Sequence, residues 1–119
     1  MSIVFYDALH VIGALLTFTG LGGLAALALS GSYDNKAARV PFVMCHGIGL
    51  LILLVAGFGA LAKLGVGFPP WVIVKLVLWL FLGASMTLFK RKAALAKTLV
   101  LVVIAAGVAA AYLGNFKPF

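Results

Sequence analysis

The sequence predicts an all-α integral membrane protein, an antiparallel up-and-down four-helix bundle with short loops. Three observations predict this class: 66% of the 119 residues are hydrophobic, only 9% are charged, and the mean hydropathy is +1.28. Soluble domains are about half apolar and a quarter charged. Because a helix needs roughly 20 apolar residues to cross a hydrocarbon layer of about 30 Å, we expect one domain, residues 1–119, with the lipid bilayer as its solvent.

The first helix is expected at residues 3–29, where an apolar run ends at the turn formers Ser30-Gly31-Ser32-Tyr33-Asp34-Asn35. Residues 1–6 contain no Lys or Arg, so the charged start of a cleavable signal peptide is missing and we expect this helix to be retained. The second helix is expected at residues 40–64. Pro41 suits its first turn, because an amide there would lack a partner anyway.

The third helix is expected at residues 70–89, after a breaker with two glycines and two prolines at residues 65–70. Lys75 is the one charged residue within it. The basic turn Lys90-Arg91-Lys92 then separates it from a fourth helix, expected at residues 94–113. These four segments account for nearly the whole chain.

The distribution of charge predicts the orientation of the bundle. Nine Lys and Arg against two Asp give a net charge of +7, but no basic stripe with interleaved aromatics exists that would indicate binding to nucleic acid. Loops one and three must share one side, and six basic residues lie in or next to them: Lys36, Arg39, Lys90, Arg91, Lys92 and Lys97. Because the other side has only three, we expect loops one and three in the cytoplasm and both termini outside, in a bacterial inner membrane.

Small residues recur at four-residue spacing, which lets helices approach closely in lipid. The sets are Gly22-Ala26-Ser30, Ala56-Ala60 and Ala106-Ala110. Packing within the bundle is the favoured interpretation, and a face for dimerisation is the alternative. The single cysteine, Cys45, excludes an internal disulfide and is expected to be a small buried apolar residue.

Ionisable residues inside a bilayer are costly, so the few that occur here are the best indicators of function. Asp7 and His10 are three residues apart and share a helix face, and Tyr6 lies on nearly the same stripe. Lys75 enters the membrane from the same outer side at the level of His10. We therefore expect a cofactor-binding group of Tyr6, Asp7, His10 and Lys75 in the outer leaflet; a purely structural ion pair, with Lys75 snorkelling outward, is the alternative.

His46 lies on the second helix, nearer the cytoplasmic side. Its depth should differ from that of His10 by roughly 10 Å or more, which argues against one metal bound by both imidazoles. A hydrogen-bonded structural role is favoured for His46 over metal ligation. The chain also has no Glu, no Cys/His metal spacing and no Gly-rich phosphate loop, so a non-catalytic role is favoured over an enzymatic one.

An aromatic and acidic lead into a histidine, Phe5-Tyr6-Asp7-Ala8-Leu9-His10, is followed at the third helix by Pro70-Trp71-Val72-Ile73-Val74-Lys75-Leu76. Together these patterns resemble small bacterial membrane proteins that include the SirB-like invasion-regulator family, the HemJ-type protoporphyrinogen oxidases and the CopD-like domains. The resemblance implies that His10 is the axial ligand of a haem and that Lys75 is a partner of a haem propionate or a second ligand. The HemJ type's elements after this histidine are replaced here by residues 12–18, without an Arg, which argues against protoporphyrinogen oxidation.

Three functions are therefore open. The leading hypothesis is a non-catalytic or redox-accessory membrane protein that binds b-type haem, or another apolar cofactor, at His10 and Lys75. The second, which needs no cofactor, is a structural or assembly subunit of a membrane complex or a homo-oligomer. The third is a small transporter or channel. The absence of a polar stripe through the middle of any helix counts against it.

Overall fold

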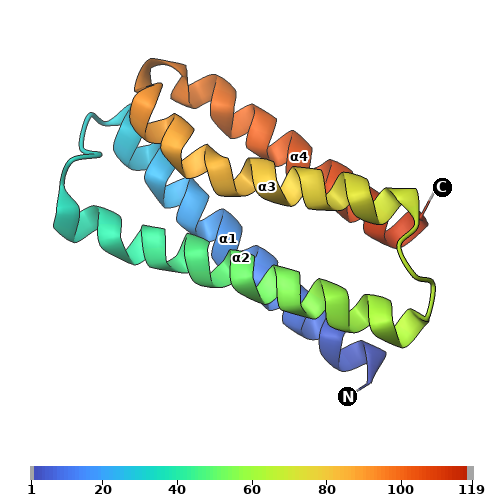
Figure 1. Ribbon diagram of the computed structural model, residues 1–119. Coiled ribbons are helices and arrows are strands. Elements are labelled where there is room, and N and C mark those ends of the chain that lie inside the picture. The colour runs from blue at the N-terminus through green and yellow to red at the C-terminus, as the bar shows by residue number, and fades with distance from the viewer. Residues whose placement is uncertain (1, 118–119) are drawn as a thin grey trace.

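The computed structural model describes residues 2–117 and confirms the expected fold class. Each of its four long helices is long and apolar enough to cross a membrane, judged by length and composition. Successive helices run antiparallel, so the loops after the first and third helices lie at one end (Figure 1). The segment 65–69, the start of α1 and the end of α4 lie at the other. The elements are α1 (Ile3–Leu29), α2 (Lys36–Leu64), α3 (Pro70–Arg91), a short 3-10 turn η1 (Ala93–Leu95) and α4 (Ala96–Phe116).

The second helix begins four residues earlier than expected. Asn35 caps it, since its side-chain oxygen accepts a hydrogen bond from the amide of Ala38 at 3.3 Å. The expectation that Pro41 lies in the first turn is therefore wrong: the proline lies in the second turn, where its missing amide removes one hydrogen bond of the helix. The third and fourth helices also extend beyond the expected ends, to Arg91 and Phe116.

The first two helices pack against each other along their whole length because glycines line their contact. A Cβ atom on Gly20 would lie 2.6 Å from both the amide nitrogen of His46 and the carbonyl oxygen of Phe42. A Cβ on Gly49 of α2 would likewise collide with α1, and a Cβ on Gly13 of α1 would collide with α2. Only hydrogen fits between these backbones, so α1 and α2 form a close pair of the small-residue kind.

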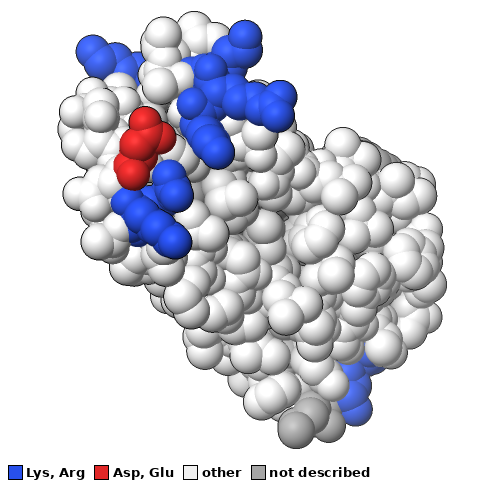
Figure 2. Space-filling model, turned by 60° about the vertical axis from the view of Figure 1, so that its left-hand side comes forward, with Lys and Arg blue, Asp and Glu red and all other residues white. Residues whose placement is uncertain are grey.

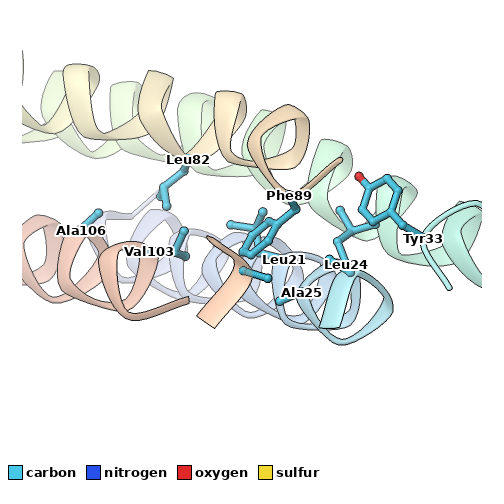
Figure 3. Close-up of a cluster of buried hydrophobic side chains, with 10 residues drawn as sticks. Leu21, Leu24, Ala25, Tyr33, Leu82, Phe89, Val103 and Ala106 are labelled. Carbon is cyan, nitrogen blue, oxygen red and sulfur yellow. The ribbon is translucent and has the colours of Figure 1, made fainter. Parts of the chain in front are cut away.

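The packed core lies toward the end that carries loops one and three. Figure 3 shows Leu21, Leu24 and Phe89 at its centre, and all three are at most 2% exposed. Buried residues of α1 meet those of α3 and α4 here, with Tyr33 of the first loop at the edge. Partly buried side chains of α2, among them Phe42 and Leu50, pack against this cluster. This end of the bundle is therefore filled with side chains contributed by all four long helices.

Hydrogen bonds from side chains to backbone carbonyls join α2 and the first loop to α3. Such bonds matter here because α2 and α3 make few close backbone contacts. Each crosses between segments far apart in the sequence and satisfies a polar group in an apolar setting. They run from Tyr33 to Met86 (3.1 Å), from His46 to Leu82 (2.9 Å) and from Trp79 to Leu50 (3.0 Å).

The outer surface is apolar around the bundle, and its charged side chains lie at the two ends, most of them at one. Each helix exposes large apolar side chains, among them Val11, Leu51, Leu80 and Leu101, as lipid contact requires. Figure 2 shows Lys and Arg side chains gathered at the end with loops one and three, together with an acidic residue. Figure 2 also shows Lys or Arg at the opposite end, so the fold has the expected excess of basic residues at the end with loops one and three, six of the nine, with the other three toward the opposite end.

The small-residue sets divide between the interior and the surface. Ala56 and Ala106 are buried inside the bundle, as expected. The interpretation was wrong for Gly22 and Ala26, which are exposed on α1, and for Ser30, which is exposed at its C-cap. A Cβ on Gly22 would meet nothing within 4 Å. Cys45 is half-buried rather than fully buried.

Candidate functional site

A cavity of about 960 Å³ lies between the four helices, in the half of the bundle that ends at the termini and segment 65–69. Its lining comes from residues 3–19 of α1, 53–64 of α2, 71–82 of α3, 107–115 of α4 and Lys117, which caps α4. Figure 1 shows the reason for the opening: α1 runs obliquely, close to α3 and α4 at its C-terminal end and away from them at its N-terminal end. The cavity falls within the size range of sites for small molecules and cofactors.

His10 forms part of the cavity wall that α1 and α2 build. Its ring lies beside Gly57, where a Cβ atom would be 3.8 Å from Cδ2 and 3.9 Å from Nε2. Among the side-chain hydrogen bonds found within residues 2–117, none involves this ring, and His10 lines the cavity. A half-buried imidazole with free ring nitrogens is therefore presented to the cavity.

Lys75 approaches the same cavity from the wall that α3 and α4 build. Its Nζ atom lies over Gly114, where a Cβ atom would be only 2.6 Å away. Because position 114 has no side chain, the amine reaches α4 at a point where a larger residue would displace it. The expectation that His10 and Lys75 face a common site is in keeping with this placement, since both line the cavity.

The other two residues expected at the site are placed differently. Asp7 also lines the cavity, near enough to His10 for its charge to act on the imidazole, as the charge of Lys75 does. Lys117 is near enough to Lys75 for the two like charges to interact. The expected compensation of the Lys75 ammonium by Asp7 stays a prediction. The ring of Tyr6 packs on Gly59 of α2, and Tyr6 is not among the residues that line the cavity.

The sequence analysis missed several residues at the cavity mouth. Trp71 and Lys117 come together there, with the Lys117 Nζ atom 5.6 Å from the centre of the Trp71 ring. Lys117 Nζ also donates a hydrogen bond to the carbonyl of Gly114 at 2.8 Å. From the sequence, Lys117 was one of the three basic residues expected on the outer side. That position was the signal that could have indicated its place at the cavity mouth.

His46 lies away from the cavity, inside the packed part of the bundle. It is 2% exposed, and its Nε2 atom lies 2.9 Å from the carbonyl oxygen of Leu82. A carbonyl only accepts, so Nε2 must carry the proton and donate, which leaves it unable to bind a metal while this bond persists. His46 backs onto Gly20 whereas His10 is ten residues earlier on α1, about 15 Å along a helix, so the two imidazoles lie at separate levels.

Metal ligation by a cluster of protein side chains has no support. Within the part of the chain that the structure describes, no group of three or more His, Cys, Asp or Glu residues could hold an ion. Comparison of the chain with protein-family models, with curated proteins and with solved structures gave no match.

The donor set suits an amphipathic ligand with an apolar body and acidic groups. One free imidazole faces a large apolar space, and two amines stand at its mouth. A single histidine holds the iron of many haem proteins, and carboxylates such as haem propionates pair with amines. The residues present thus fit a b-type haem with one protein axial ligand.

Proposed function

We propose that this small integral membrane protein binds an amphipathic cofactor in its intramembrane cavity, and that the cofactor is b-type haem. The observation that carries the proposal is the common cavity of His10 and Lys75, whose walls come from all four helices. The resemblance of the segments around these two residues to the HemJ-type proteins supports the same assignment.

Each site residue has a role in this proposal. His10 would supply the nitrogen that binds the iron, and Asp7 places a negative charge near the imidazole. Lys75 would pair with a carboxylate of the cofactor, and Gly57 packs beside the imidazole without a side chain of its own. A bound haem supplies a centre that gains and loses single electrons; the protein positions it, excludes water from its faces and sets its environment through the axial ligand and burial.

The absorption spectrum of the detergent-purified protein tests this function. After expression with added haem precursor, we expect a Soret band that is lost in His10→Ala. The matched control is His46→Gln, in which an amide can still donate to the Leu82 carbonyl and the band should persist. A wild-type protein that stays colourless after expression and after titration with haem would refute the proposal.

The location proposed for the protein is a bacterial inner membrane, with loops one and three in the cytoplasm and both termini outside. The excess of Lys and Arg at the end shown in Figure 2 supports this orientation, because such residues are retained on the cytoplasmic side. The cavity then opens in the outer half of the bilayer. Its ligand would enter from the outer leaflet or the periplasmic surface.

A second candidate function is a structural subunit of a membrane complex or a homo-oligomer. The exposed residues Gly22, Ala26 and Ser30 on α1 favour it, because small residues on a lipid-facing surface allow close contact with another helix. Cross-linking in native membranes would test it: a defined oligomer or partner that is lost in Gly22→Leu would support this role, and an unchanged monomer would not.

A transporter or channel is less well supported than either. The polar residues of the cavity lie in the outer half of the bundle, and the half beyond Leu82 is filled by the core around Leu24 and Phe89. Conduction needs a continuous polar or hydrated path. Ionic conductance of the purified protein in liposomes would favour this function instead.

A further inference from the structure

Two lysines from different helices converge on one glycine at the cavity mouth. The Lys75 Nζ atom, from α3, lies where a side chain on Gly114 would point. The Lys117 Nζ atom, at the end of α4, donates a hydrogen bond to the carbonyl oxygen of Gly114 at 2.8 Å. Lys117 adopts the left-handed conformation (φ 46°, ψ 58°) that ends α4, and this turns its side chain back along the helix. Both amines therefore stand within one turn of α4.

Among residues 2–117, no acidic side chain pairs with these two amines. The chain contains only two acidic residues, Asp7 and Asp34. Asp34 is in the first loop at the far end of the bundle, and the charge of Asp7 acts on His10. The charge that acts on Lys75 is that of Lys117. Two ammonium groups held together repel each other, and an anion that contacts both removes this cost.

The surroundings of the amines restrict what the anion can be attached to. The Trp71 ring, 8% exposed, lies 5.6 Å from the Lys117 amine and forms part of the cavity wall. Beyond it, the α3 wall runs inward to Leu82, eleven residues further along and so about 16 Å deeper. The lining there is dominated by apolar side chains. A ligand held by its anionic end thus extends an apolar body into the bundle.

We propose that Lys75, Lys117 and the Trp71 ring form a headgroup site for an amphiphile with a carboxylate or phosphate group, whose apolar body occupies the cavity. This deepens the proposed function, on which it rests for the identity of the apolar body, and it adds Lys117 as a second anion-binding residue. Haem propionates and lipid headgroups share this chemistry. In either case the anion bridges the two amines and the apolar part lies toward His10.

Quenching of tryptophan fluorescence tests the headgroup site without haem. The probes are brominated stearic acid and its methyl ester, titrated into full-length protein in neutral detergent, because Trp71 and Trp79 both line the cavity. We expect the acid to bind about tenfold more tightly than the ester, as a charge-assisted hydrogen bond predicts. Lys75→Gln and Lys117→Gln should each reduce this preference several-fold, and the double variant should abolish it. Lys63→Gln, an exposed outer-end lysine outside the cavity, is the matched control.

The outcomes separate this site from the haem proposal. Equal binding of acid and ester, or an unchanged preference in Lys117→Gln, overturns the headgroup site even if the Soret band is present. A preference for the acid that survives in His10→Ala and disappears in the double lysine variant supports the site even if the protein binds no haem. Parallel titration with haem then identifies the source of the anion: loss of haem affinity in Lys117→Gln indicates propionates, and unchanged haem affinity with lost acid preference indicates a lipid or fatty acid.

Discussion

The Nε2 atom of His46 lies 2.9 Å from the carbonyl oxygen of Leu82, and this contact joins α2 to α3 in the middle of the bundle. A histidine buried to 2% in an apolar setting would be costly without such a partner. The bond explains why one of the two histidines is structural while the other is free to bind a ligand. It also fixes how far apart the two helices stand.

Replacing His46 should weaken the bundle. We expect His46→Ala to lower the free energy of unfolding by about 1–2 kcal/mol, because an interhelical hydrogen bond is lost within the membrane. His46→Gln should recover part of this loss. Unfolding in mixed micelles with increasing SDS, followed by circular dichroism, measures the difference; equal stability of His46→Ala and wild type would show that the contact contributes nothing.

The contact between α1 and α2 should tolerate no side chain at Gly20. A Cβ there would lie 2.6 Å from backbone atoms of α2, so we expect Gly20→Ala to destabilise the protein by about 1–3 kcal/mol. Gly22→Ala, two residues along the same helix, is the matched control because nothing lies within 4 Å of its new Cβ. The same SDS titration applies. If both variants unfold alike, the helices are not as closely packed as this contact requires.

The hydropathy of the chain predicted the helices well but could not predict their faces. Long apolar runs fix where a chain crosses lipid, and the breakers at residues 30–35 and 65–70 separate them. Every face of such a helix is apolar, however, so nothing in the run distinguishes lipid from core. This is why Gly22, Ala26 and Ser30 were assigned to the interior although they lie outside. The start of α2 was missed because weight was given to Pro41 rather than to the cap at Asn35.

The candidate site was predictable where it depended on helix depth. His10, Asp7 and Lys75 were expected near one level because successive helices enter from alternate sides, and all three line one cavity. The contribution of Lys117 depends on the left-handed turn at the end of α4 and on the absence of a side chain at Gly114. Both are local three-dimensional features that hydropathy does not encode.

The space in front of His10 gives a second test of ligand binding. A Cβ on Gly57 would be in ordinary contact with the imidazole at 3.8 Å, so Gly57→Ala should fold and bind normally. Gly57→Leu should fill the space beside the ring and reduce bound haem at least about tenfold, as a lost axial contact of a few kcal/mol implies. The ratio of haem to protein measures this, with SDS unfolding as the check on the fold. Normal haem content in Gly57→Leu would place the ligand elsewhere.

The orientation of the chain can be tested with single cysteines. In a Cys45→Ser background, we expect Phe68→Cys in segment 65–69 to react with a membrane-impermeant maleimide in intact bacterial cells. Ser32→Cys in the first loop should react only after the membrane is permeabilised, because the basic end faces the cytoplasm. Both positions are at the bundle ends, outside the long helices. The opposite labelling pattern would reverse the topology and place the cavity in the inner leaflet.

The protein should lose stability at alkaline pH because of Tyr33 in the first loop. Burial raises the pKa of the Tyr33 hydroxyl, an effect that the nearby Arg39 partly opposes, and the neutral hydroxyl donates to the Met86 carbonyl at 3.1 Å. A group whose pKa is higher in the folded than in the unfolded protein stabilises the fold fully at any pH below its unfolded pKa. This stabilisation is lost as the pH rises through its folded pKa.

Tyr33→Phe should therefore be less stable than wild type by about 1 kcal/mol at neutral pH. The difference should shrink above the ordinary range of tyrosine ionisation, because only the wild type must then bury a phenolate. SDS unfolding of both proteins across this pH range measures it, and a constant difference would show that Tyr33 does not titrate in its folded position.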